Sequence, residues 1–346
     1  MQNKKRGFYL ALVATLLASI VVGLGAYTRL VHAGLGCPDW PGCYGFLTVP
    51  ESAEDIAHAE KLFPHAPVEV EKGWPEMVHR YVAGFLMLLV LAVVFQAFKY
   101  RRDPDRPIKL PCFILGLIIL QAAFGMWTVT LKLWPQVVTA HLLGGFATFS
   151  LLFLLTLRLS GIQRPSIAGA SRLRWLGITG LLVVILQISL GGWTSANYAA
   201  LACPDLPTCH NQWLPAMNFT EGFNLSQSIG PNYLGGQLDG TARTAIHFIH
   251  RLGALLTTAV LLLLILKTFL HTSTLSGATR GLLRLAASVV LLVLTLQVSL
   301  GLSNIIWSLP LSVAVAHNLG GALLLLSMVA YNFVLQTPSV KGRAKA

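Results

Sequence analysis

The sequence predicts an all-α integral membrane protein with eight transmembrane helices, arranged as two tandem four-helix bundles. Three observations lead to this prediction. Hydrophobic residues make up 55% of the chain and charged residues 11%, and the mean hydropathy is +0.67, a composition far from that of soluble globular domains. Eight segments are apolar over about 20 residues, the length that a helix needs to cross a bilayer. Motifs in the second half repeat those of the first in the same order, as expected for a duplicated unit.

The first apolar segment, residues 8–30, is predicted to be a retained span and not a cleaved signal peptide. It is too long for the apolar region of a signal peptide and lacks a clear small-x-small cleavage site. The eight predicted spans are 8–30, 77–98, 110–130, 137–158, 175–196, 244–267, 283–305 and 312–335.

Two connections between these spans are long, roughly 31–75 and 197–243, and both lie on the same side of the predicted membrane. The first is acidic and is expected to contain a short amphipathic helix around 51–62. The second is rich in Gly, Asn and Pro and is expected to be irregular. The other connections on that side, near 132–136 and 307–311, are only a few residues long, so the long loops are candidates to cover a site.

The charge distribution predicts the orientation in the membrane. Of the 25 Lys and Arg residues, 18 lie in the connections and tails on one side, whereas 11 of the 13 acidic residues lie on the other side. This positive-inside bias predicts that both termini are cytoplasmic. The net charge of +12 therefore reports topology. Since no basic strip interleaved with aromatic residues remains, nucleic acid is not an expected partner.

The internal repeat has four spans per unit. Gly25-Ala-Tyr-Thr28 matches Gly191-Gly-Trp-Thr194 at an offset of 166, and His79-Arg80 matches His250-Arg251 at an offset of 171. The sequence Ala-His-x-Leu-Gly-Gly occurs at 140–145 and again at 316–321. Four is an even number, so the units share one orientation, and a pseudo-two-fold axis along the membrane normal is predicted. The expected divisions are an N-terminal bundle (1–158), a cytoplasmic linker (159–174) and a C-terminal bundle (175–346).

Four histidines lie at similar depth near the outer ends of the even-numbered spans: His79, His141, His250 and His317. A histidine inside a membrane span is costly, which makes it a candidate functional residue. Imidazoles paired across facing helices are typical axial ligands of haem iron. Alternatively, each histidine bonds a neighbouring helix or caps a span end. His247 precedes His250 by three residues on the same helical face, so either could be the ligand.

The remaining histidines have no repeat partner and are expected to be solvated. They are His32, His58, His65, His210 and His271.

Glu76 distinguishes the two halves, because the second half has His247 at the matching position. Glu76 precedes His79 by three residues and shares its helical face. A desolvated carboxylate near lipid suits a general base, so we expect proton chemistry in the first half and a permanent cofactor in the second. The alternative is a solvated carboxylate favoured by the helix dipole.

Two cysteine pairs, Cys37 with Cys43 and Cys203 with Cys209, each enclose five residues with two prolines in an outer loop. This spacing predicts disulfides in an oxidising compartment. Reversible thiol–disulfide exchange above the haem sites is the alternative role. Cys112 is alone near the inner end of the third span and is expected to be buried.

Four arginines lie near the outer ends of spans: Arg29, Arg80, Arg243 and Arg251. A guanidinium binds carboxylates in a bidentate manner, so these residues are candidate partners of haem propionates. The alternative is snorkelling to the membrane interface.

The chain resembles the haem A synthase family of bacterial and mitochondrial inner membranes. The resemblance covers residues 8–335 and depends on Glu76-x-x-His79-Arg80, the Ala-His motifs at His141 and His317, His250-Arg251 and the two cysteine loops. The family oxidises the C8 methyl group of haem O to a formyl group by successive hydroxylations, giving haem A for terminal oxidases.

The resemblance also implies roles for individual residues. His79 and His141 would flank the substrate, haem O, while His250 and His317 would ligate a resident haem b and Glu76 would act in catalysis. The implied location is the bacterial plasma (inner) membrane, where the protein would contact membrane lipid. Haem O synthase and terminal oxidase assembly factors are the implied protein partners. The electron acceptor is left open, and small helix-packing residues permit homo-oligomers.

Two other functions fit a membrane protein with two haem sites. One is a di-haem b electron-transfer cytochrome, which leaves the difference between Glu76 and His247 without a purpose. The other is a haem carrier or transporter, from which haem would leave unmodified.

Overall fold

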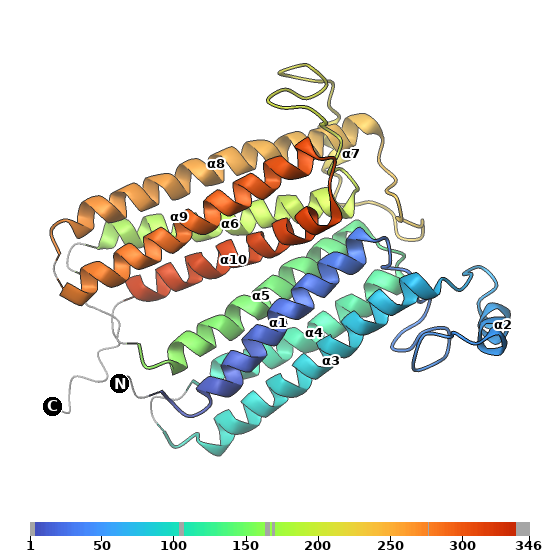
Figure 1. The fold of residues 1–346 in the computed structure, drawn as a ribbon, viewed down its shortest axis with the longest axis horizontal. Coiled ribbons are helices and arrows are strands. Elements are labelled where there is room, and N and C mark those ends of the chain that lie inside the picture. The colour runs from blue at the N-terminus through green and yellow to red at the C-terminus, as the bar shows by residue number, and fades with distance from the viewer. Residues whose placement is uncertain (1–3, 104–106, 163–166, 168–169, 276, 337–346) are drawn as a thin grey trace.

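The computed structural model describes residues 4–103, 107–162, 167, 170–275 and 277–336 (Figure 1). This part of the chain is helical and contains no β-strand, only two isolated bridges in the outer loops. Eight of its helices are long and apolar enough to cross a membrane. The all-α membrane class is therefore confirmed.

The eight long helices coincide with the eight predicted spans. They are α1 (Phe8–Leu30), α3 (Val70–Lys99), α4 (Lys109–Thr130), α5 (Pro135–Leu159), α6 (Ser171–Ala196), α8 (Gly240–Thr272), α9 (Gly277–Ile306) and α10 (Leu311–Leu335).

Four helices start four or more residues before their apolar segments. α3 begins at Val70, α6 at Ser171, α8 at Gly240 and α9 at Gly277, whereas the predicted spans begin at 77, 175, 244 and 283. Hydropathy marks only the apolar part of a helix and misses a polar first turn. Asp239 caps α8, since its Oδ1 accepts a hydrogen bond from the Ala242 N–H at 2.7 Å.

Both long loops contain a short helix. α2 (Ala53–Leu62) confirms the amphipathic helix predicted in the first loop, and its N-cap Ser52 accepts a hydrogen bond from the Asp55 N–H. The second loop contains α7 (Phe219–Gly222), capped by Asn218. The prediction of an irregular second loop missed this helix, because a single turn leaves no periodic pattern.

The long helices form two groups of four, which lie side by side in Figure 1. In the first group, α1 and α4 each pack against α3 and α5; in the second, α6 and α9 each pack against α8 and α10. Contacts of α5 with α6 and of α10 with α1 and α5 join the groups. This arrangement agrees with two four-helix bundles. The residue boundaries of the bundles stay predictions, since part of the linker lies outside the described residues.

Matching residues of the two halves adopt matching conformations. Lys132 and Leu133, after α4, have φ of 51° and 61°, and Ser308 and Leu309, after α9, have φ of 56° and 63°. Contact also occurs between matching residues. His32 stacks on Tyr198, 166 positions later, with ring centroids 5.5 Å apart and planes 5° from parallel. Residues on a two-fold axis meet their own counterparts, so this contact supports the predicted pseudo-two-fold axis.

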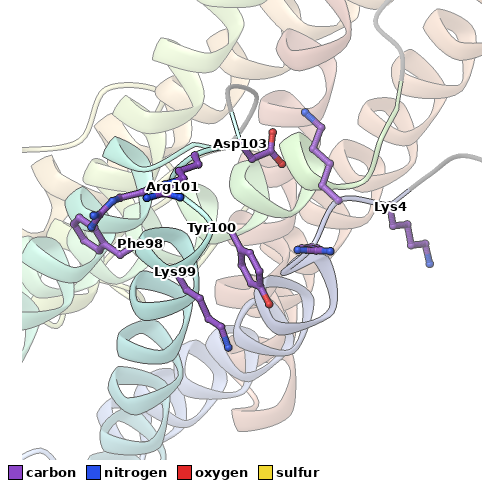
Figure 2. A pocket seen from close by; sticks show the side chains of 9 residues that line it. Lys4, Phe98, Lys99, Tyr100, Arg101 and Asp103 are labelled. Atoms are coloured by element: carbon purple, nitrogen blue, oxygen red, sulfur yellow. The ribbon is translucent and has the colours of Figure 1, made fainter.

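Positive charge collects at the end of the bundle where α1 begins and α3 ends. Residues 4–6 and 98–103 line an open hollow there of about 960 Å³. Figure 2 shows the side chains of Lys4, Lys99 and Arg101 around it. We call this the basic end, and we call the opposite end, with residues 31–69 and 197–239, the loop end.

The expected burial of Cys112 is wrong, because its side chain is exposed on the first turn of α4. Its neighbour Phe113 is also exposed.

Glycine packing on the inner face of α6 gives a test of the fold. A Cβ at Gly180 would lie 2.9 Å from Met328 Cε and 3.0 Å from Leu261 Cδ2, whereas a Cβ at Gly116 would meet nothing within 4 Å. We expect Gly180→Leu to cost about 1–3 kcal/mol through overpacking. Thermal unfolding in detergent should show a lower midpoint for Gly180→Leu and an unchanged midpoint for the control, Gly116→Leu. Equal midpoints for the two variants would contradict this packing.

Candidate functional site

The structure brings together the two histidines of the first half. His79 lies on α3 and His141 on α5, and their rings are close enough to interact electrostatically. Each ring lies against a glycine of a neighbouring helix. A Cβ at Gly25 of α1 would lie 3.0 Å from His79 Cε1, and a Cβ at Gly125 of α4 would lie 3.5 Å from His141 Cε1. The glycines therefore make room for the imidazoles between the helices.

The second half repeats this geometry. His250 on α8 interacts electrostatically with His317 on α10. A Cβ at Gly191 of α6 would lie 3.2 Å from His250 Cε1, and a Cβ at Gly301 of α9 would lie 3.1 Å from His317 Cε1. We call these two sets the first pair (His79 and His141) and the second pair (His250 and His317).

The ring nitrogens of the four paired histidines have few hydrogen-bond partners in the protein, which leaves them able to bind a metal. Nδ1 of His79, His141 and His317 is buried without a hydrogen-bond partner among the described residues. His250 Nδ1 instead lies 3.1 Å from the Gln187 amide nitrogen. His317 Nε2 lies 3.4 Å from the Gln297 amide nitrogen. Half-buried imidazoles with so few polar partners fit the axial ligands of a haem iron.

Glu76 and His247 occupy matching positions and bind matching groups. Both are buried, with exposed fractions of 5% and 4%. Glu76 Oε2 accepts a hydrogen bond from the Cys37 N–H at 3.0 Å, and His247 Nδ1 accepts one from the Cys203 N–H at 3.1 Å. His247 thus holds its loop through this hydrogen bond. The assignment of His250 as the partner of His317 stays a prediction.

Glu76 also forms an ion pair on its other oxygen. Arg80, one turn along α3, donates to Oε1 at 2.5 Å. Both carboxylate oxygens of the buried Glu76 therefore accept hydrogen bonds, one turn of helix before His79. The second half places a neutral imidazole in this position, so only the first half carries a buried carboxylate there.

The arginines predicted to bind propionates are bonded to backbone carbonyls. Arg80 donates to the carbonyls of residues 39, 41 and 42. Arg251 donates to the carbonyls of Thr208 at 2.9 Å and Cys203 at 2.6 Å. Both arginines thus tie a cysteine loop to the helix beneath it, a role that sequence reasoning missed. Their binding to propionates stays a prediction.

The other two arginines also make local contacts. Arg29 donates to the Ser195 carbonyl at 2.6 Å and lies 4.0 Å from the centroid of the Tyr198 ring, so it links the two halves. Arg243 donates to the Leu238 carbonyl at 2.9 Å. Their role with propionates likewise stays a prediction.

Both predicted disulfides are confirmed. Cys37 bonds to Cys43 and Cys203 to Cys209, with S–S distances of 1.99 and 2.05 Å. Asp205 shapes the second loop by accepting from the Thr208 hydroxyl and from the N–H groups of residues 210 and 211. These bonds, that of the Thr208 hydroxyl first, lower the pKa of Asp205 to about 2. Because its pKa is lowered, Asp205 keeps these bonds at every pH above about 4, the ordinary pKa of an aspartate. It loses them only as the pH falls towards 2.

One unpaired histidine is less solvated than expected. His271, in the last turn of α8, has a buried Nε2. His32 is exposed, as expected, although its ring stacks on Tyr198, and partial burial, followed by the nearby charges of Arg29 and Lys72, lowers its pKa. This stacking joins residues 166 positions apart and leaves no local sequence signal.

The second long loop reaches the first half, which sequence reasoning also missed. The Trp134 indole donates to the Gln227 carbonyl at 2.9 Å, Gln136 donates to the Leu225 carbonyl at 3.1 Å, and the Tyr233 N–H donates to the Lys132 carbonyl at 3.0 Å. These bonds attach the loop to the start of α5, the helix that carries His141. The loop therefore joins the two halves above the first pair.

These features define a multi-pass helical membrane protein with two pairs of histidines packed against glycines and two disulfide loops. The family model for the cytochrome oxidase assembly protein family (COX15-CtaA) matches residues 8–329. The chain belongs to this family.

Curated relatives align along nearly the whole chain. The heme A synthase of Shewanella oneidensis is 49% identical over 333 residues, which cover 94% of this chain and 94% of the relative. The heme A synthases of Rhizorhabdus wittichii and Caulobacter vibrioides are each 27% identical, over 96% and 97% of this chain and 94% and 98% of the relatives.

Arg251→Ala tests how the second cysteine loop is held. The variant loses two charge-assisted hydrogen bonds, each worth about 1.5–3 kcal/mol. We expect backbone amide exchange in residues 201–210 to rise by at least about tenfold in hydrogen–deuterium exchange. Residues 37–45, held by Arg80, are the internal control and should exchange as before. Unchanged exchange in both loops would show that Arg251 does not hold its loop.

Proposed function

We propose that this protein is a haem A synthase, an oxidoreductase that converts the C8 methyl group of haem O to a formyl group by successive hydroxylations. The relatives named above support this activity, since they align over nearly their full length with this chain. The second hydroxylation would give a geminal diol, and loss of water from the diol would leave the formyl group of haem A.

The observation that most favours an enzyme is the difference between two otherwise matching sites. Each half has two histidines against two glycines, but a buried carboxylate, Glu76, adjoins only the first pair. We infer that the first pair, His79 and His141, binds the substrate, haem O. The second pair, His250 and His317, would hold a resident haem b, which when bound supplies electron transfer.

The residues of the chain would position the substrate and handle a proton. Glu76 would accept a proton released during oxidation of the methyl group, and Arg80 would orient this carboxylate through its hydrogen bond to Oε1. The disulfide loop above Glu76, bonded to it through the Cys37 N–H, would limit access of water to the site.

The proposed location is a bacterial plasma membrane with the loop end in the periplasm and both termini in the cytoplasm. The disulfides at the loop end fit an oxidising compartment. The cations at the basic end fit the cytoplasmic side. The proposed protein partners are haem O synthase, which would supply the substrate, and terminal oxidase assembly factors, which would receive haem A.

Replacing Glu76 with Gln tests the proposed catalytic role. The amide can still accept the Cys37 N–H but cannot serve as a base. We expect conversion of haem O to fall by about 10²–10⁴-fold while bound haem is retained. Conversion would be measured by separating the pigments extracted from cells that also make haem O.

Glu71→Gln is the matched control, since Glu71 is an exposed carboxylate on the same helix, and it should convert haem O normally. Normal conversion by Glu76→Gln would rule out the proposed role of Glu76. Extraction of haem b alone from the parent protein would favour an electron-transfer cytochrome, and unmodified haem O alone would favour a carrier.

A further inference from the structure

We propose that the two cysteine loops are anchors in the membrane interface. The first cysteine loop (residues 37–47) inserts Leu47 into the lipid leaflet at the loop end, and the second (residues 203–214) inserts Trp213 and Leu214. We call these three residues the loop tips. This contact with lipid is independent of the proposed function, because it involves neither histidine pair.

The two cysteine loops have the same local fold, so Leu47 and Trp213 occupy matching positions. The carboxylates of Asp39 and Asp205 each accept hydrogen bonds from the backbone N–H groups five and six residues later. An isolated bridge follows in each loop. Leu47 and Trp213 come directly after these bridges, at the offset of 166 that also relates the two cysteine pairs.

The loop tips are apolar side chains without cover from the rest of the protein. The exposed fractions of Leu47, Trp213 and Leu214 are 85%, 76% and 76%. The carboxylates of Asp39 and Asp205 are bonded within their own loops, so they do not oppose contact of the tips with lipid. An exposed leucine is common on protein surfaces, and exposure alone therefore indicates no partner. The level of the loops along the helices does.

Arg80 and Arg251 mark this level. Each is the last charged residue before an uncharged run, which extends over 82–98 in α3 and 252–266 in α8. At about 1.5 Å per residue these runs cover about 22–25 Å, close to the roughly 30 Å of a hydrocarbon core. The two arginines therefore lie at the membrane boundary. Because both donate to carbonyls of the cysteine loops, the loops lie at this boundary too.

The first cysteine loop lies on the lipid-facing side of α3. The Tyr81 hydroxyl donates to the Leu47 carbonyl, and the Tyr81 side chain is itself exposed. Phe85 is one turn further into the uncharged run, on the same side of the helix, and is also exposed. Exposed apolar side chains along a membrane-spanning run contact lipid. Leu47 therefore lies at the edge of a surface that lipid already covers.

The second cysteine loop lies beside α8 in the same way. Arg251 donates to the Thr208 carbonyl at 2.9 Å, five residues before Trp213. Leu252 and Leu255, which begin the uncharged run of α8, are exposed. In Figure 1 this loop, in dark yellow-green, projects sideways from α8 and not beyond the end of the helix. Tryptophan is enriched at the membrane interface, where its ring contacts acyl chains and its N–H contacts polar groups.

Fluorescence quenching in bilayer nanodiscs tests the anchoring of the second loop. The full-length protein is placed in phosphatidylcholine brominated near the headgroup end of its acyl chains. The emission lost in Trp213→Phe gives the contribution of Trp213. We expect bromine to lower this contribution by at least about twofold relative to plain lipid, because bromine quenches indoles that touch the acyl chains.

Trp74 is the matched control. It lies on α3 seven residues before Tyr81, and its indole donates to Glu51 in the acidic loop. The emission lost in Trp74→Phe should be the same in brominated and plain lipid.

Leu47→Trp in the parent sequence tests the first loop independently. The emission that it adds should also fall by at least about twofold in brominated lipid. This variant decides the question if Trp213→Phe does not fold.

Unchanged emission of either tryptophan in brominated lipid would overturn the anchoring of its loop. Quenching of that tryptophan by aqueous iodide would then place the loop tip in water. Protection from iodide would instead place it against another protein.

Discussion

The close contact between each paired imidazole and a glycine of a neighbouring helix is the constraint on which the site depends. The would-be Cβ positions lie only 3.0–3.5 Å from the Cε1 atoms of the four rings. Helices in a bilayer associate through close packing of small residues. Here the same glycines also leave room for the imidazole rings. The residues that allow close helix packing therefore also set the positions of the histidines. Because both halves place two imidazoles against glycines in this way, the duplicated bundle presents two sites of the same basic design.

The loops are attached to the sites by buried polar groups. Arg80 and Arg251 donate hydrogen bonds to backbone carbonyls of the two cysteine loops. Glu76 and His247 accept hydrogen bonds from the backbone N–H of the first cysteine of each loop. A buried polar group is costly unless it is bonded, so these contacts also hold the groups themselves in place. Glu76 thus has a structural bond as well as a proposed catalytic role, and its substitution must be judged by haem content together with product.

Sequence reasoning predicted the spans and the disulfides, because hydropathy and cysteine spacing are local signals. It did not predict that Arg80 and Arg251 bind loops, since a guanidinium near a span end fits several partners. It missed the attachment of the second long loop to α5, which joins residues about 90 positions apart. The exposure of Cys112 was also missed, because a single apolar residue does not show which side of a helix faces lipid.

The most direct test of the central claim is electron paramagnetic resonance of the haem-loaded protein. Two low-spin signals are predicted, one from each histidine pair. His79→Ala should remove one of them and His250→Ala the other. Persistence of both signals in either variant would contradict the assignment of the pairs as separate haem sites.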